Sequence, residues 1–133
     1  MGFTDRNKAL ELHTLAAKQG HPYSQLSLGM IYQDGEYVTT MHKDYKKAVK
    51  WYTLSAGQGV FTAQYKLGVM YKDGLGVIQA YAKAHMWDNI GASNGSLKGK
   101  LDRAKIAEQM TPFQIEKAQD LARECVAKNF KGC

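Results

Sequence analysis

Apolar residues recur along the chain at the three- and four-residue spacing of amphipathic α-helices, and glycines interrupt the pattern at intervals. The first helical stretch covers about residues 5–19, and Gly20 follows it at a position where helices often stop. Pro22, a residue favoured at the first helical position, opens a second stretch that ends at Gly35. This spacing predicts helices rather than strands, in which apolar and polar residues would alternate.

Five more helices are predicted after the second one. Asp44 is placed to cap the third helix with its carboxylate, whereas Ala80 stands at the corresponding position before the fifth, which we expect to start without a side-chain cap. Thr111, followed three residues later by Gln114, predicts a capping box at the start of the last helix. The chain is therefore predicted to be all-α, with about seven helices.

Each predicted helix carries an apolar stripe that it must bury against a neighbour. In the first helix the stripe consists of Ala9, Leu12 and Ala16. The stripes of the third, sixth and seventh helices consist of Ala48, Trp51, Tyr52, Leu54 and Ala56, of Leu101, Ala104 and Ala107, and of Ile115, Ala118, Leu121, Ala122 and Cys125. We expect these residues to lie in the core.

Parts of this pattern recur in the same order along the chain. The segment Leu28-Gly29-x-x-Tyr32 recurs as Leu67-Gly68-x-x-Tyr71, 39 residues later. A second set of matches, offset by 39 and then by 36 residues, aligns Ala9, Leu12 and Gly20 with Ala48, Trp51 and Gly59, and these with Ala84, Trp87 and Gly95. Repeats of this length indicate a solenoid of helix pairs, in which each pair buries its apolar face by stacking on the next.

The repeats divide residues 1–133, which we expect to form a single domain, into four parts. They are a half-repeat at residues 5–20, repeats at residues 22–59 and 61–95, and a degenerate C-terminal helix pair at residues 96–133 that is expected to cap the stack. Either the half-repeat is itself an N-terminal cap, or a helix that preceded it is absent. The apolar side of the half-repeat is left partly uncovered. A homodimer that covers this side at the N-terminal end is therefore one alternative to a monomer.

Glycine inside a helix needs an explanation, because it lowers helix propensity by roughly 0.8–1.0 kcal/mol. Gly29 and Gly68 occupy the same position of the repeat. A missing side chain at this position lets a bulky residue of the paired helix approach closely. We therefore expect both glycines to be packing residues.

Composition agrees with one folded domain: of the 133 residues, 44% are hydrophobic and 23% are charged. The net charge is +6, and the last third of the chain holds eight basic and five acidic residues. This excess favours either acidic partners or, more simply, solvated outer helix faces, and no nucleic-acid motif accompanies it. No apolar run reaches the roughly 18 residues of a membrane span, and the N-terminal residues lack the apolar region of a signal peptide.

Candidate catalytic and metal-binding residues do not form a known motif. The sequence contains no Gly-x-Ser-x-Gly, Walker or His-Glu-x-x-His motif. Its histidines are scattered, and two cysteines alone cannot complete a zinc site. His85 is interpreted as a packing or surface residue rather than a base. We therefore predict no enzyme activity, no cofactor and no metal.

The pattern Ala-x-x-x-Leu-Gly-x-x-Tyr-x-x-Gly-x-Gly-Val, followed by Lys-Ala-x-x-Trp and Ala-x-x-Gly, resembles the Sel-one-like repeat family, relatives of the tetratricopeptide repeats. The likeness covers residues 5–95, and residues 96–133 look like the terminal segment of small bacterial members. It implies a right-handed α/α superhelix that acts as a non-catalytic scaffold for a peptide or protein partner. The sequence departs from the family pattern in the loop 36–43 and at Ala80.

In such solenoids the first helix of each pair lines a concave groove, so the resemblance implies a set of partner-binding residues. They are Tyr23, Leu26, Met30 and Gln33 in one repeat and Tyr65, Val69 and Lys72 in the next. Met30 and Tyr65 would form an apolar floor, while Gln33 and Lys72 would hold the partner's backbone or a carboxylate. Packing of Leu26 and Tyr65 against the neighbouring unit is the alternative, and it stays open.

Exported, cysteine-containing members of the family form bridges at the spacing of Cys125 and Cys133, so the resemblance implies a disulfide between these two residues. Two free thiols are the alternative, and a cytoplasmic location would favour them. With the disulfide, a periplasmic or secreted location is expected. Some cysteine-rich relatives bind or slowly hydrolyse β-lactams, which makes β-lactam or cell-wall binding with weak hydrolase activity the alternative function.

Overall fold

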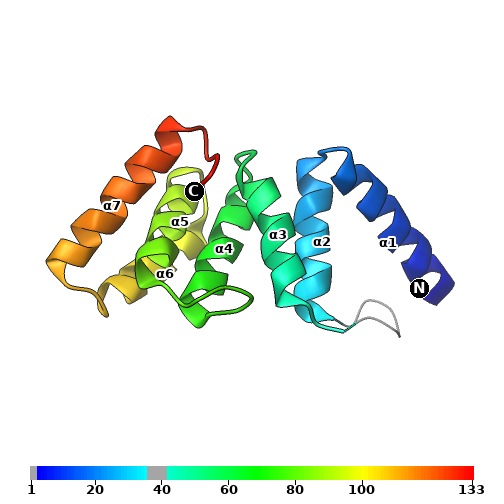
Figure 1. Cartoon of the computed structure of the whole chain (residues 1–133), viewed down its shortest axis with the longest axis horizontal. Helices are drawn as coiled ribbons and strands as arrows, with labels where there is room; N and C mark the ends of the chain where they lie inside the picture. Colours follow the sequence, from blue (N-terminus) through cyan, green and yellow to red (C-terminus); the bar gives the residue numbers. More distant parts are fainter. Residues whose placement is uncertain (1–2, 36–41) are drawn as a thin grey trace.

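The computed structural model describes residues 3–35 and 42–133, and this part of the chain contains seven helices and no strand (Figure 1). The helices are α1 (Phe3–Lys18), α2 (Pro22–Asp34), α3 (Tyr45–Ala56), α4 (Phe61–Asp73), α5 (Tyr81–Ser93), α6 (Leu97–Ala107) and α7 (Pro112–Ala127). The predicted all-α class is confirmed. Most of the loop 36–43, where the sequence departs from the family pattern, lies outside the described residues.

The helix ends follow the predicted capping residues. An Asp44 carboxylate oxygen accepts a hydrogen bond from the Lys47 amide at 3.1 Å and caps α3. At α7, the Gln114 amide donates to Thr111 Oγ1 at 3.2 Å, and the Thr111 amide donates back to Gln114 Oε1 at 2.8 Å. The fifth helix begins at Tyr81 without a side-chain cap. All three predictions about helix ends are confirmed.

The first five helices stack in chain order, and an equivalent hydrogen bond joins α2 to α1 and α4 to α3. Helix α2 packs between α1 and α3, and α4 packs between α3 and α5 (Figure 1). The buried Gln25 side chain donates to the Ala17 carbonyl at the end of the preceding helix at 3.1 Å, and Gln64, 39 residues later, donates to Ala56 at 3.2 Å. We name α2 and α4 the A helices, and α3 and α5 the B helices.

Close contacts at two glycines join the A and B helices of each pair. A Cβ atom on Gly29 would run into the ring of Tyr52, and one on Gly68 would run into the carboxylate of Asp88. Tyr52 and Asp88 occupy the same repeat position, 36 residues apart. Both interior glycines are therefore packing residues, as the sequence predicts.

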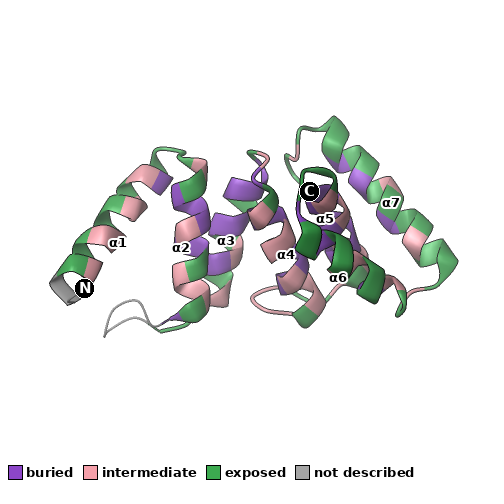
Figure 2. Cartoon of the chain, turned by 180° about the vertical axis from the view of Figure 1, so that it is seen from behind, coloured by how far each residue is buried: buried purple, intermediate pink, exposed green. Residues whose placement is uncertain are grey.

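The hydrophobic core is most continuous in the middle of the stack. Buried residues concentrate in α2, α3, α4 and α5 and are fewer in α1, α6 and α7 (Figure 2). The predicted burial is wrong for five residues, which are exposed: Leu12, Leu54, Leu101, Ala104 and Leu121. Each lies on a helix face that no neighbouring helix of the described chain covers, and on α1 and α6 the contact uses a different side of the helix, which holds Ala17 and Ile106.

The last two helices do not pack on each other as the A and B helices do. Both α6 and α7 pack on α5, and they have at most marginal contact with each other. The C-terminal tail returns to the turn between α3 and α4, where Lys131 Nζ donates to the Gly57 carbonyl at 2.8 Å. The expected helix pair at residues 96–133 is thus two separate helices on α5. Ala104 stands where Gly29 and Gly68 permit close approach, so α6 lacks the feature that joins a pair.

Gly29→Ala is expected to lower the free energy of unfolding by about 1–3 kcal/mol, because the added methyl group overpacks the contact with Tyr52. Gly91→Ala is the matched control. Gly91 is also buried within a helix, but a Cβ atom there would find its closest neighbours at an ordinary 3.4 Å. Urea denaturation measures both variants. Equal midpoints for the two would contradict the packing role of Gly29.

Candidate functional site

On α2, the predicted groove residues divide into accessible and packed ones. Tyr23 and Met30 are exposed, and their seven-residue separation places them on one face of the helix. Leu26 is only 9% exposed and belongs to the core, so it packs inside the stack rather than lining an open surface. Gln33 is half-buried, and its side-chain oxygen accepts a hydrogen bond from Tyr52 Oη at 2.5 Å.

On α4, the three predicted groove residues Tyr65, Val69 and Lys72 are all half-buried. Lys72 Nζ lies 3.5 Å from a carboxylate oxygen of Asp102, which α6 contributes. Burial is the largest cause that raises the pKa of Tyr65, and the charge of the Asp102 carboxylate raises it further. Asp102 therefore pairs with Lys72 and acts on Tyr65 through its charge.

A buried carboxyl group lies close to these contacts. Asp88 of α5 is 1% exposed, and neither of its carboxyl oxygens has a hydrogen-bond partner among the described residues. It lies against Gly68, at the position where the first pair places the ring of Tyr52. Lys72 corresponds in turn to Gln33, so the second pair lacks the hydrogen bond that joins Tyr52 to Gln33 in the first.

Burial is the main reason that the pKa of Asp88 rises, to about 8, and the Asp102 carboxylate raises it further against the opposing charges of Lys72 and Arg103. His85 lies one turn before Asp88 on α5. Burial, and secondly the charge of Arg103, lowers its pKa. Both the carboxyl group of Asp88 and the imidazole of His85 are therefore held neutral at pH 7.

These residues form a polar cluster at the junction of three helices. We name it the Asp88 cluster; it consists of Tyr65 and Lys72 of α4, His85 and Asp88 of α5, and Asp102 and Arg103 of α6. Perturbed titratable groups often mark functional sites, although structural networks perturb pKa values too. The carboxyl group of Asp88 is closed to solvent, whereas Tyr65, Lys72 and Asp102 are partly exposed.

Sequence reasoning found Tyr65 and Lys72 but missed Asp88, Asp102 and Arg103. The available signal for Asp88 was the 36-residue offset that aligns it with Tyr52, because a position filled by a large ring in one repeat is a buried position in the next. The contribution of α6 carried no such signal, since its sequence does not follow the Leu-Gly-x-x-Tyr pattern.

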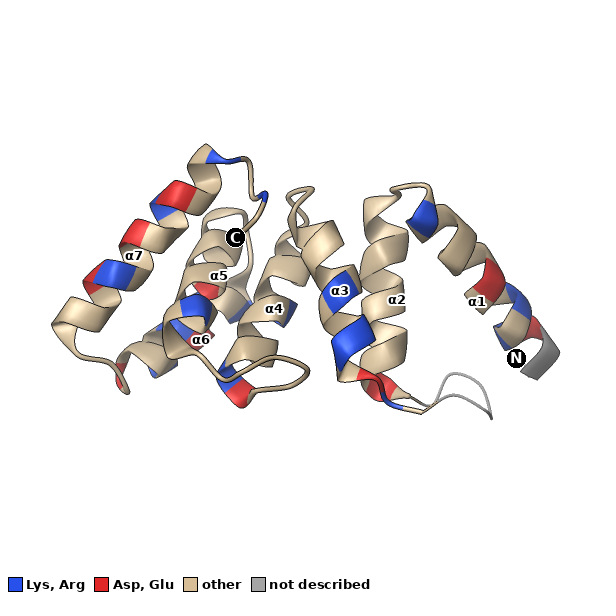
Figure 3. Cartoon of the chain, in the orientation of Figure 1, with Lys and Arg blue, Asp and Glu red and all other residues tan. Residues whose placement is uncertain are grey.

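The basic residues of the last third lie mainly on outer helix faces. Seven of the eight are exposed, and acidic and basic side chains are interspersed along α7 (Figure 3). Arg103 is the half-buried exception, and its guanidinium group donates to Asn89 Oδ1 at 2.6 Å. This distribution fits the simpler interpretation of the basic excess, solvated helix surfaces.

A disulfide joins Cys125 of α7 to Cys133 in the C-terminal tail, with the two Cα atoms 5.6 Å apart. Cys125 is buried, and Phe130 packs against the same core cluster. Together with the Lys131 hydrogen bond, these contacts hold the tail against the middle of the stack. The pairing is the one that the family resemblance implies.

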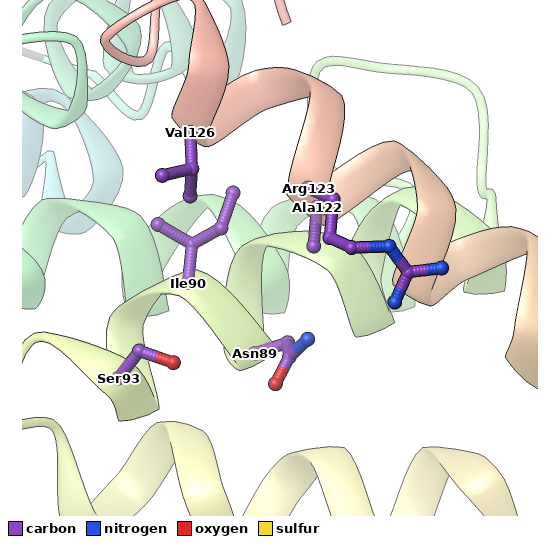
Figure 4. Close-up of a pocket in the computed structure, with 6 residues that line it drawn as sticks. All are labelled: Asn89, Ile90, Ser93, Ala122, Arg123 and Val126. Atoms are coloured by element: carbon purple, nitrogen blue, oxygen red, sulfur yellow. The ribbon is translucent and has the colours of Figure 1, made fainter.

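A cavity of about 250 Å³ lies between α5 and α7 (Figure 4). It is lined by Asn89, Ile90, Ser93, Ala122, Arg123 and Val126. Its volume is below the roughly 300–1,000 Å³ of most small-molecule sites. We interpret it as a loose fit of α7 on α5 rather than as a ligand site.

Metal and membrane sites are not found in residues 3–35 and 42–133. No group of three or more His, Cys, Asp or Glu side chains in this part of the chain is placed to hold a metal ion. No helix within the same residues combines the length and the apolar character that crossing a bilayer requires.

Stacked helix pairs with matching contacts define an α/α solenoid, a class of protein in which each repeat contacts its neighbours. The chain belongs to the Sel1 repeat family, because the sequence profile of the Sel1 repeat matches residues 2–21, 22–60 and 62–96. Proteins of this family are generally scaffolds that bind protein partners, and they are typically non-catalytic. The predicted family is confirmed.

Two solved bacterial structures are similar to the chain. One is c5321, a protective antigen present in uropathogenic Escherichia coli strains that displays an SLR fold, with a TM-score of 0.88 and 28% identity over 97% of this chain. The other is a Sel1 repeat protein from Oxalobacter formigenes, with a TM-score of 0.69 and 29% identity over 84% of this chain. The chain spans only 28% and 34% of those two proteins. No curated protein sequence matches it.

The free energy of unfolding is expected to fall as pH rises from about 4 to about 8, by up to about 1.4 kcal/mol per pH unit from Asp88 alone. The unfolded chain loses this proton near pH 4, whereas the folded chain keeps it until about pH 8, so the folded state binds more protons in this range. The side chain of Asn cannot ionise, so Asp88→Asn should flatten the dependence of the free energy of unfolding on pH. The free energy of unfolding of this variant should match that of the parent near pH 4 and exceed it near pH 8.

Urea denaturation at a series of pH values measures this effect. Asp73→Asn, which changes an exposed carboxylate on α4, is the matched control and should keep the slope of the parent. If the free energy of unfolding changes with pH equally in Asp88→Asn and in the parent, Asp88 is not a buried neutral acid.

Loss of the disulfide, by reduction or by Cys133→Ser, is expected to lower the free energy of unfolding by about 2–3 kcal/mol, because the bond closes a short loop that restricts the unfolded chain. Intact mass spectrometry of protein kept without reductant should give a mass lower by two hydrogens than after reduction. Equal masses would instead indicate two free thiols.

Proposed function

We propose that the chain is a non-catalytic interaction scaffold that holds a peptide or protein segment along its two A helices. A row of accessible residues on these helices carries the proposal: Tyr23 and Met30 of α2, and Tyr65 and Val69 of α4. Met30 and Val69 occupy the same repeat position, so a segment that crosses both helices meets equivalent side chains on each. Tyrosine and methionine are enriched at protein interfaces, and methionine adapts to varied apolar surfaces.

Polar groups near this row would orient the partner. Gln33 is already bonded to Tyr52, and Lys72 is paired with Asp102, so a carboxylate of the partner must compete with Asp102 for Lys72. A partly exposed ion pair of this kind contributes only about 0–1 kcal/mol, so it opens at little cost. Lys72 is thus the residue of this row best suited to hold a carboxylate.

We further propose that the protein works in an oxidising compartment, the periplasm or the cell exterior. The disulfide between Cys125 and Cys133 supports this location, because such bonds persist in oxidising compartments and are rare in the cytosol. The mass of the protein purified from its source without reductant tests the location, and free thiols in that material would contradict it.

The binding site can be tested with a peptide selected from a random displayed library against the immobilised protein. Met30→Ala combined with Tyr65→Ala is expected to weaken binding of that peptide at least tenfold, or about 1.4 kcal/mol, because it removes the two apolar anchors. Leu54→Ala, which changes an exposed leucine of α3, is the matched control and should leave the affinity unchanged.

Circular dichroism first confirms that both variants are folded. Fluorescence anisotropy of the labelled peptide then gives each dissociation constant. Unchanged binding by the double variant, or a loss confined to Leu54→Ala, would place the site away from the A helices and overturn the proposal.

A further inference from the structure

Two helices cover the buried carboxyl group of Asp88. The group is 1% exposed, and neither of its oxygens has a hydrogen-bond partner among the described residues. Helix α4 meets it at Gly68, where an added Cβ atom would run into Asp88 Oδ1. Helix α6 crosses the backbone at the same place, because a Cβ atom on Gly99 would lie 2.9 Å from the Asp88 carbonyl oxygen. The carboxyl group is therefore enclosed by α4 and α6 together.

His85, one turn before Asp88 on α5, is buried at the same junction. Its side chain is 3% exposed, and Nδ1 has no hydrogen-bond partner within residues 3–35 and 42–133. Arg103 of α6 donates to Asn89, one turn after His85, so α6 lies along this face of α5. The junction of α5 and α6 thus buries two ionisable side chains with unpaired polar atoms, and such groups are rare in folded proteins because their burial costs free energy.

The ionisable groups around Asp88 come from α4, from α5 itself and from α6. They are Tyr65, Lys72, His85, Asp102 and Arg103. Helix α7 meets another side of α5, at Ile90 and Ser93, and its Arg123 is paired there with Asp120. Of the charges that act on Asp88, that of the Asp102 carboxylate has the largest effect. Ionisation of Asp88 therefore sets two like charges against each other across the contact between α5 and α6.

Of the two helices that cover Asp88, α6 is held less firmly than α4. Helix α6 buries two residues, whereas α4 buries five. Helix α4 is also joined to α5 by a hydrogen bond of 2.9 Å, which Asn94 donates to Gln64. The ion pair of Lys72 with Asp102, which joins α6 to α4, is partly exposed, and such pairs contribute little. An opening that exposes Asp88 is therefore expected to move α6 and to leave the pair of α4 and α5 in place.

We propose that α6 is a pH-linked lid, which opens while α4 and α5 stay paired and which lets water reach the side chains of His85 and Asp88. Asp88 loses its proton once it is exposed, and the anion then opposes closure because it would return to a buried position near Asp102. Opening also takes Asp102 away from Lys72, so the Lys72 ammonium group is freed at the same time. The inference concerns α6 and does not depend on whether a partner binds the A helices.

The two buried groups respond to pH in opposite directions. Burial, more than the charge of Asp102, raises the pKa of Asp88 from 3.8 to about 8 in the closed state, so opening releases a proton and becomes easier as pH rises toward 8. Burial, and secondly the charge of Arg103, lowers the pKa of His85 from 6.5, so below that pH opening takes up a proton and becomes easier as pH falls. The effect of Asp88 therefore dominates between about pH 6.5 and 8.

Native-state hydrogen exchange at pH 6.5 and pH 7.5, corrected for the intrinsic exchange rate at each pH, measures the opening of α6. In the parent, the protection of α6 amides is expected to fall about fivefold from the lower to the higher pH. Asp88→Asn should show no such fall, because its side chain cannot ionise. Asp73→Asn, at an exposed carboxylate of α4, is the matched control and should behave as the parent does. The same exchange at low urea concentrations separates opening of α6, which exposes little surface and depends weakly on urea, from global unfolding.

Three results would overturn the proposal. The first is equal protection of α6 in the parent at both pH values, and the second is an equal fall in Asp88→Asn. The third is the same dependence on urea for α6 and α4 amides, because Asp88 would then be exposed only by global unfolding. Carboxyl ¹³C resonances of the parent give the pKa of Asp88 without any substitution, and a value near the ordinary 3.8 would overturn the proposal as well.

Discussion

Each A helix of this protein can hold its B helix closely only because a glycine leaves its backbone open to a side chain of the partner. Gly29 accepts the ring of Tyr52, and Gly68 accepts the carboxyl group of Asp88. The interior glycines weaken their own helices, so the packing that they permit must more than offset that loss. Where Ala104 replaces the glycine, the following helix packs elsewhere, and the regular order of the solenoid ends.

The same constraint explains why a carboxyl group is buried in the middle of the stack. The position of Asp88 is enclosed by the pair contact whatever residue occupies it, so a carboxyl group there loses its water without gaining a partner. It stays neutral, while Asp102 and Lys72 pair at the more accessible edge. The repeat that carries half of the proposed partner surface is therefore also the one that buries an unpaired carboxyl group, and its stability is expected to fall as pH rises.

Local signals in the sequence predicted much of this fold, because caps, turn residues and repeat spacing act within a few residues of one another. Asp44 and Thr111 are examples, since each caps the helix that comes after it. The place of α7 could not be predicted, because α5 and α6 both offer it an apolar face and only the three-dimensional fit decides between them. For the candidate site, the positions in the repeat predicted Tyr65 and Lys72. Asp102 could not be predicted in this way, because it comes from a helix that does not repeat the Leu-Gly-x-x-Tyr pattern.

Native-state hydrogen exchange tests the central claim most directly, that cohesion of the stack comes from the two complete helix pairs and decreases toward its ends. In dilute protein, we expect core amides of α4 and α5 to exchange only through global unfolding, while those of α1 exchange through local opening at a lower free energy. Equal protection of α1 and α4 would contradict this claim, because α1 would then gain as much stability from one neighbour as α4 gains from a complete pair.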